Sequence, residues 1–298
     1  MKFDICYSCT KCCVSGYEEE RLSSRRLQKM HTVPASTRRV FLSGAVALSL
    51  GPARAAVPPL RVVASSVPHV EILDFVADKL AADLPLKIIE ISGDLRPNAL
   101  LRDGDADANF FQHVPFLRTE EAAMGVHFAV VAAVHIEPLG LYSRRVKALN
   151  ALPTGGLVSL SNTVSNTNRG LLLLQANGLI RLRTKDAGAL ATLDDVIENP
   201  KKLRFVEIAP PQVPRSLDDV ALAVINGNYA LEAGLEPARD ALALERAEGN
   251  PYANVLVTTE GLAKDPRVLR LGTLLTSAEV AAFIRTRYRG SVLPVRPS

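Results

Sequence analysis

The strongest candidate for ligand binding in this sequence is an arginine at the end of a run of small polar residues. Arg169 follows Asn162–Asn168, between a short apolar segment and a helical one. A cation in a first helical turn is opposed by the positive end of the helix dipole, so it is best placed beside an anion. A ligand carboxylate would supply that anion through a charge-assisted pair worth about 1.5–3 kcal/mol. The alternatives are an exposed arginine and an ion pair with a protein carboxylate.

Carboxamide side chains accompany this arginine. Asn166 lies shortly before it, and Asn226 and Asn228 follow the apolar run 221–225. An amide can accept a hydrogen bond from an ammonium group and donate one to a carboxylate without changing its protonation. The alternatives are helix capping for Asn166 and turn formation for Asn226, because Asn-Gly favours left-handed backbone conformations.

Two adjacent aromatic residues and a histidine end another expected strand. Side chains alternate across a sheet, so one of Phe110 and Phe111 should enter the core. The other would then face a cleft, where it could hold an apolar or thioether side chain. His113 could contact a ligand, bind a metal, or serve as a hydrogen-bonded structural histidine.

A metal site or an enzyme active site finds less support. A zinc receptor would need about three ligands to converge from His69, His113, His135 and Glu137, and these residues lack the paired local spacing of zinc motifs. The sequence contains no G-x-S-x-G, Walker, G-x-G-x-x-G or H-E-x-x-H motif. We therefore predict a non-enzymatic protein without a cofactor or bound metal.

Apolar runs alternate with helical periodicity along most of the chain. In the first half we expect strands at 60–64, 86–91 and 107–111, with helices at 69–82, 96–101 and from 115. In the second half we expect strands at 157–160, 204–208 and 221–225, with helices at 171–176 and 229–233. This order predicts an α/β protein with a largely parallel sheet, in which ligands bind at the carboxyl ends of the strands.

Two extended segments, 134–142 and 252–257, flank the second set of elements. We interpret them as crossovers that form a hinge between two lobes. The first lobe would comprise residues 56–138 and 255–298, and the second residues 139–254.

The N-terminal region resembles an export signal. Arg38 and Arg39 precede an apolar run, 44–50, which ends before Ala53-Arg54-Ala55. A charged region, an apolar region and a small-x-small site in this order are typical of secretory signals, and the paired arginines resemble a twin-arginine signal. We predict a signal at 30–55, cleavage near Ala55 and a periplasmic location.

Every cysteine lies upstream of that signal, within an extension at 1–29 that we expect to result from a misassigned start. The four cysteines are Cys6, Cys9, Cys12 and Cys13. Without them the mature chain has no disulfide and no cysteine for lipidation after the signal. A net charge of +4 does not indicate nucleic-acid binding.

Six segments, in this order along the chain, resemble the NlpA/MetQ family of methionine-binding substrate-binding proteins. They are 105–116 (DADANFFQHVPF), 134–143 (VHIEPLGLYS), 198–203 (ENPKKL), 214–219 (PRSLDD), 224–235 (VINGNYALEAGL) and 251–255 (PYANV). The resemblance implies a type II-like, two-lobed periplasmic-binding fold that closes around L-methionine or a closely related amino acid. It also implies a monomer that delivers this ligand to an ABC permease and ATPase, with another small amino acid or a methionine-containing peptide as the alternative ligand.

The resemblance also assigns roles to the candidate residues. It implies that Arg169 binds the ligand carboxylate and that Asn166 and Asn226 hold the α-amino and carboxylate groups. Phe110 or Phe111, together with His113, would border the side-chain pocket, and Asn228 is a further contact. One position departs from the family, because Leu95 stands where a tyrosine is common and so removes one wall of the pocket.

Overall fold

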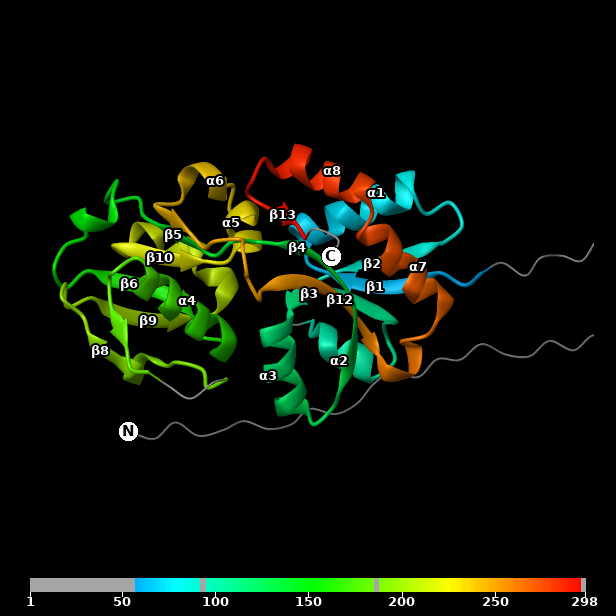
Figure 1. The fold of residues 1–298 in the computed structure, drawn as a ribbon, viewed down its shortest axis with the longest axis horizontal. Coiled ribbons are helices and arrows are strands. Elements are labelled where there is room, and N and C mark those ends of the chain that lie inside the picture. Colours follow the sequence, from blue (N-terminus) through cyan, green and yellow to red (C-terminus); the bar gives the residue numbers. More distant parts are fainter. Residues whose placement is uncertain (1–56, 92–94, 185–187, 296–298) are drawn as a thin grey trace, which may run out of the picture. The chain divides into compact units, whose positions relative to one another are not determined.

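The computed structural model describes residues 57–91, 95–184 and 188–295. Residues 55–298 form one compact unit, which contains two main β-sheets (Figure 1). The predicted extension 1–29 and export signal 30–55 lie outside the described residues. None of the helices within the described ranges is long and apolar enough to cross a membrane.

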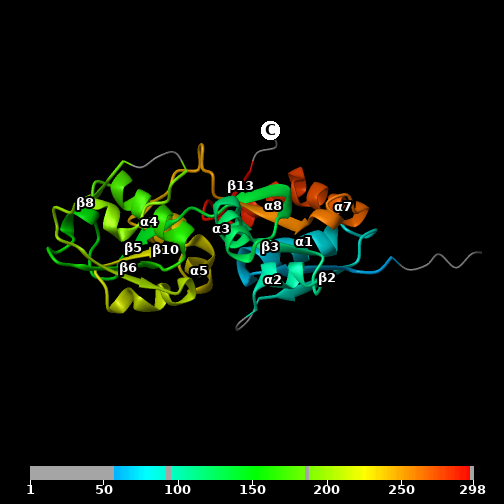
Figure 2. The same cartoon turned by 90° about the horizontal axis from the view of Figure 1, so that it is seen from below.

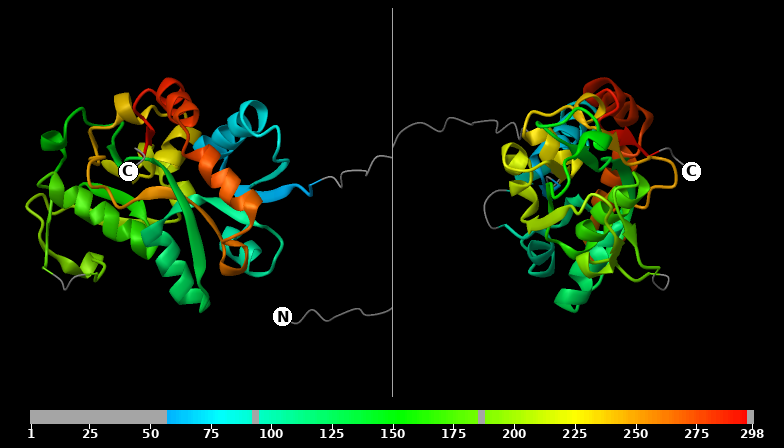
Figure 3. Two further views of the ribbon diagram at one scale, coloured as in Figure 1. Left: turned by 45° about the vertical axis from the view of Figure 1, so that its right-hand side comes forward. Right: turned by 90° about the vertical axis from the view of Figure 1, so that its left-hand side faces the viewer.

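The first sheet has the strand order β13-β4-β12-β3-β1-β2. Its strands are β1 (Leu60–Ala64), β2 (Leu86–Glu90), β3 (Ala108–His113), β4 (Phe128–Ile136), β12 (Ala253–Thr259) and β13 (Leu293–Pro294). As expected, β1 runs parallel to β2 and β3. The sheet is nevertheless mixed, because β12 is antiparallel to both β3 and β4 and lies between them (Figure 3).

Helices cover both faces of this sheet because its strand residues alternate between two apolar cores. Val62 and Ala64 pack with one helical layer, and Val63 packs with the other. The first layer, seen on one side of the sheet in Figure 1, consists of α1 (Glu71–Lys79), α7 (Pro266–Leu275) and α8 (Ala278–Tyr288). The second layer consists of α2 (Pro97–Arg102) and α3 (Val114–Met124) and faces the viewer in Figure 2.

The second sheet has the order β11-β5-β10-β6-β9 and a core of its own. Its strands are β5 (Gly140–Tyr142), β6 (Leu157–Ser161), β9 (Arg204–Ile208), β10 (Leu222–Ile225) and β11 (Ala243–Leu244). α4 (Val164–Ala176) packs on one face, and α5 (Gly227–Glu232) packs on the other. A separate pair, β7 (Arg181–Leu182) with β8 (Val196–Glu198), and the short helix α6 (Pro237–Asp240) complete this half.

Several short helical turns join these elements. They are Ser66–Val70, Leu149–Ala151, Leu193–Asp195, Pro210–Gln212, Pro214–Asp218 and Glu260–Leu262. The chain passes from the first sheet to the second between β4 and β5, and it returns between β11 and β12. Residues next to both connections therefore lie where the two sheets meet.

One predicted helix boundary is wrong in a way that matters for the site. α4 begins at Val164 rather than at 171, so Arg169 lies in its second turn and not in its first. The polar residues that suggested a loop, Ser165 to Asn168, are all buried in the helix. Tertiary contacts have therefore overridden their weak helix propensity.

Candidate functional site

A cavity of about 220 Å³ lies between elements of the two sheets. It is smaller than the roughly 300–1,000 Å³ of pockets for drug-sized ligands. Most of its lining residues come from the carboxyl ends of strands and the helical turns that follow them, and Asn254 comes from the amino end of β12. The lining residues are Phe111, Gln112, His113, Phe116, Glu137, Thr163, Asn166, Arg169, Pro210, Pro211, Asn226, Gly227, Asn228, Tyr229 and Asn254. Six of the seven residues predicted to bind ligand are in this set, and Phe110 is the exception.

Arg169 is almost fully buried, with 2% of its surface exposed, and is held by protein groups. Its Nη2 donates to Glu245 Oε2 at 2.5 Å and to the Glu137 carbonyl at 2.9 Å, and its Nε donates to Glu245 Oε1 at 3.1 Å. The guanidinium carbon lies 4.3 Å from the centre of the Tyr252 ring. The ion pair considered as an alternative is therefore present, while Nη1 makes no hydrogen bond to a described residue and Arg169 still lines the cavity.

Two of the three predicted carboxamides, Asn166 and Asn226, form one hydrogen-bonded chain with His113. Asn226 Nδ2 donates to Asn166 Oδ1 at 3.0 Å, and His113 Nε2 lies 3.2 Å from the same oxygen. His113 Nδ1 accepts from the Phe116 backbone N–H at the start of α3, so Nε2 carries the proton that is donated to Asn166. Burial, and then the charge of Arg169, lower the pKa of His113 to about 3, so the imidazole is neutral at pH 7.

The structure distinguishes between the two adjacent phenylalanines. Phe110 is fully buried in the core of the first sheet, 4.7 Å from the ring of His69, and does not line the cavity. Phe111 points to the other side of β3, lines the cavity and contacts the ring of Phe116 edge-on. Alternation along the strand therefore makes Phe111 the cavity residue.

A larger cavity of about 580 Å³ adjoins the first and shares five lining residues with it: Phe111, Phe116, Pro211, Asn228 and Tyr229. Leu95, the position that departs from the family, lines this second cavity and not the smaller one. A tyrosine at position 95 would therefore line this second cavity.

Two residues of the site had no distinctive signal in the sequence: Gln112, which lines the cavity, and Glu245, which pairs with Arg169. Gln112 belongs to a buried amide network in which its Nε2 donates to Asn98 at 2.7 Å and to Asn109 at 2.9 Å. Glu245, the partner of Arg169, lies 76 residues away from it in the sequence. Only the three-dimensional fold brings Arg169 and Glu245 together.

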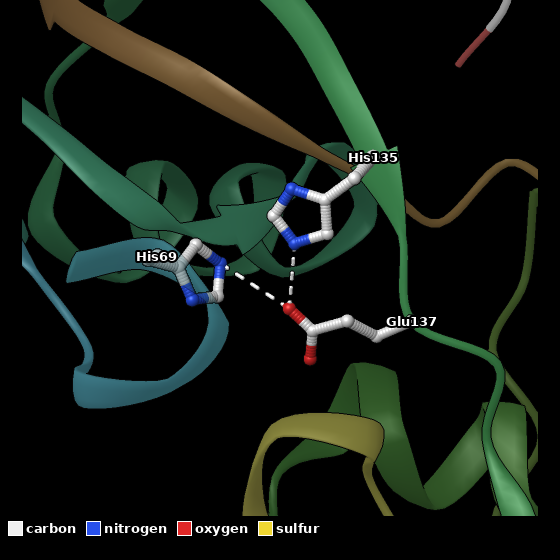
Figure 4. A group of neighbouring side chains, drawn as sticks. All are labelled: His69, His135 and Glu137. Atoms are coloured by element: carbon white, nitrogen blue, oxygen red, sulfur yellow. Dashed lines mark hydrogen bonds and ion pairs between the residues drawn. The ribbon is translucent and has the colours of Figure 1, made fainter. Parts of the chain in front are cut away.

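From the sequence, Glu137 was considered only as a metal ligand, yet its side chain lines the cavity. Its Oε2 accepts from the Asn228 backbone N–H at 2.8 Å, which links it to the start of α5. Its Oε1 lies 3.3 Å from His69 Nε2 and 2.8 Å from His135 Nε2 (Figure 4). Burial raises the pKa of Glu137, while it lowers the pKa of His69 to about 4 and that of His135 to about 3.

A sequence profile of the NlpA lipoprotein family matches residues 60–296. The chain belongs to this family. It is 38% identical over 221 residues to a probable D-methionine-binding lipoprotein MetQ of Vibrio cholerae, covering 73% of this chain and 81% of the relative. It is 37% identical to the methionine-binding lipoprotein MetQ of Bacillus subtilis, covering 78% of this chain and 87% of that one.

Solved structures of family members share the fold. A nutrient-binding protein of Burkholderia cenocepacia bound to methionine superimposes with a TM-score of 0.76 at 39% identity, covering 79% of this chain and 99% of that chain. A methionine-binding lipoprotein from Bacillus subtilis gives a TM-score of 0.77 at 35% identity, covering 80% of this chain and 98% of that chain. The chain therefore has the two-lobed periplasmic-binding fold and a substrate-binding, non-enzymatic role, as predicted.

The prediction of an unlipidated periplasmic protein is wrong. The family is named for lipoproteins, and relatives from Vibrio cholerae, Bacillus subtilis and Treponema pallidum are all named lipoproteins. The prediction rested on the absence of a cysteine after the predicted signal at 30–55, since the four cysteines stand at positions 6, 9, 12 and 13.

Proposed function

We propose that this protein binds L-methionine or a closely related amino acid and delivers it to an ABC permease and ATPase. The observation that carries the proposal is that Arg169 and Asn226, from different elements of the second sheet, line one amino-acid-sized cavity with Phe111 from the first. The names of the relatives support the same ligand class, because they describe methionine-binding proteins.

The charged head of the ligand would lie against Arg169 and Asn226. Nη1 of Arg169 is the guanidinium nitrogen left for a ligand carboxylate, since Nε and Nη2 already donate to protein oxygens. Asn226 Oδ1 has no hydrogen-bond partner among the described residues, so it can accept from an α-ammonium group. Asn166 then acts mainly by fixing Asn226 and His113 through its own oxygen.

The apolar tail of the ligand would lie against aromatic and proline side chains. Phe111, Phe116, Pro210 and Pro211 line the cavity from both sheets. A thioether makes favourable contacts with ring edges, worth about 0.3–1.5 kcal/mol each. This combination favours methionine over an amino acid with a charged side chain.

Delivery of the ligand to the permease requires that ligand binding change the position of one lobe relative to the other. We propose that the monomer hinges at the connections that follow β4 and precede β12, with lobe 1 at 56–138 plus 255–298 and lobe 2 at 139–254. Because ligand contacts come from both sheets, they would favour the closed state, which would then dock on the permease.

Titration calorimetry of the purified protein with L-methionine should give saturable binding with one ligand per chain. D-methionine, leucine, glutamate and a methionine-containing dipeptide should be titrated in parallel, because the cavity size and aromatic lining favour a single apolar amino acid. An absence of heat and of a thermal shift with millimolar L-methionine would contradict the methionine assignment. Tighter binding of the dipeptide would identify the 580 Å³ chamber as part of the site.

Restoring an aromatic wall at position 95 should strengthen methionine binding. Leu95→Tyr places a ring in the chamber that adjoins the cavity, where an added ring–sulfur contact of about 0.3–1.5 kcal/mol corresponds to roughly a 2- to 12-fold lower dissociation constant. Leu95→Met, which adds no ring, is the control. Equal affinities for the two variants would show that position 95 does not contact the ligand.

A further inference from the structure

Two buried histidines and a buried glutamate form a cluster beneath the amino-acid cavity. His69 comes from the turn Ser66–Val70, His135 lies on β4, and Glu137 follows that strand. Their exposed fractions are 1%, 0% and 4%. As Figure 4 shows, both imidazoles direct Nε2 at the same oxygen, Glu137 Oε1, and the ligand atoms all lie within 4.8 Å of one another.

No arginine or lysine side chain among the described residues forms an ion pair with the carboxylate of Glu137. A carboxylate buried away from water needs a cationic partner or it is strongly destabilised. Glu137 instead faces two imidazole nitrogens, His69 Nε2 at 3.3 Å and His135 Nε2 at 2.8 Å from its Oε1. The nearby guanidinium of Arg169 contacts only the backbone carbonyl of Glu137 and pairs with the carboxylate of Glu245.

We propose that His69, His135 and Glu137 bind a divalent transition-metal cation at the base of the cavity. Two imidazoles and one carboxylate are a common donor set for such ions. Zinc–ligand bonds of about 2.0–2.2 Å in a tetrahedron separate the donor atoms by roughly 3.3–3.5 Å. Glu137 Oε1 lies 3.3 Å and 2.8 Å from the two imidazole nitrogens, and the three donor atoms all lie within 4.8 Å of one another. Binding would therefore require the carboxylate to move outward and the imidazoles to converge on the ion.

The surroundings of the cluster fit this role. Ser65 Oγ lies 2.7 Å from His69 Nδ1, so it can orient this ring with Nε2 towards the ion. The Asn228 N–H donates to Oε2 of Glu137 at 2.8 Å. Asn254 Oδ1 lies 3.2 Å from His69 Nε2 and offers an oxygen as a fourth donor atom. Glu137 and Asn254 both line the cavity, which gives the ion a route of entry.

The proposal predicts one tightly bound Zn²⁺ per chain. The test uses the full chain in which the four cysteines at positions 6, 9, 12 and 13 are replaced by serine, because thiolates would bind zinc independently. After dialysis against micromolar Zn²⁺ and then buffer, elemental analysis should find one zinc per chain, and EDTA should lower the melting temperature. A parent protein that retains no zinc and is not stabilised by it would overturn the proposal.

Variants locate the ion. His135→Ala should raise the zinc dissociation constant more than about 100-fold, beyond the roughly 10- to 100-fold effect of outer partners. His127→Ala, at an exposed histidine outside the cluster, should leave the stoichiometry unchanged. Zinc that survives His135→Ala, or that is lost in His127→Ala, would place the ion elsewhere. These measurements contain no amino acid, so they stand or fall independently of the proposed methionine binding.

Discussion

Replacing Arg169 by alanine should abolish amino-acid binding in calorimetric titrations. Truncating one partner of a buried charge pair costs about 2–5 kcal/mol, which raises the dissociation constant from roughly 30-fold to several thousandfold. The ligand carboxylate would lose the only cationic side chain that lines the cavity among the described residues, apart from histidine. The fold should persist, because the released partner, Glu245, is 16% exposed and can reach water.

A second variant separates ligand binding from the role of Arg169 in its protein ion pair. Glu245→Gln removes the competing negative charge from Nε and Nη2 but leaves the guanidinium in place. We therefore expect methionine affinity to be unchanged or tighter, in contrast to Arg169→Ala. Arg181→Ala removes an arginine from an exposed ion pair with Glu198 outside the cavity, so it should leave methionine binding unchanged. If Glu245→Gln weakens binding as much as Arg169→Ala does, Arg169 serves the ion pair and the ligand carboxylate binds elsewhere.

Local patterns in the sequence were sufficient to place most elements and the ends of the strands. Apolar runs such as 60–64 and 221–225 agree closely with β1 and β10, because buried strands in a parallel sheet are almost continuously apolar. Arg169 and Asn226 each follow such a strand, and the carboxyl ends of neighbouring parallel strands meet at one edge. Their shared cavity therefore follows from pattern and topology together.

The partners of the cavity residues could not be predicted in this way. Alternation implies that Phe110 and Phe111 face opposite sides, but only the packing of β3 decides which one enters the core. His69 and Glu137 are far apart in the sequence and meet because their segments end at the same place in the fold. Metal motifs are recognised by short-range spacing, which such a cluster does not have. The sequence therefore predicts that no metal is bound.

The glycine of the Asn226-Gly227 pair is not explained by turn formation, the alternative that the sequence offered for this pair. Asn-Gly suggested a left-handed turn, yet Asn226 is extended, with φ −65° and ψ 146°, and Gly227 does not have a positive φ. Glycine is needed at 227 for a different reason. A Cβ atom there would lie 2.8 Å from the Cβ of Glu137 and 3.4 Å from its Cα.

Gly227→Ala should therefore destabilise the protein and weaken ligand binding together. The contacted atoms belong to the backbone and first side-chain carbon of Glu137, so they cannot swing aside as the tip of a long side chain would. Overpacking of this kind costs about 1–3 kcal/mol, or roughly 2–12 °C in melting temperature for a chain of this size. The shift of α5 would also lengthen the 2.8 Å bond from the Asn228 N–H to Glu137 and displace Asn226.

A matched glycine provides the comparison. Gly261 lies in the turn Glu260–Leu262, and the nearest atom to its added Cβ would be Thr259 Oγ1, 4.0 Å away. Gly261→Ala should change stability by no more than about 0.5 kcal/mol and leave binding unaltered. Both variants should be compared by thermal unfolding and by calorimetry with methionine. If Gly227→Ala and Gly261→Ala have the same melting temperature and the same methionine affinity, the start of α5 tolerates displacement from Glu137. If Gly227→Ala alone loses stability and affinity, then the contact between α5 and Glu137 fixes the position of the carboxamides that line the cavity.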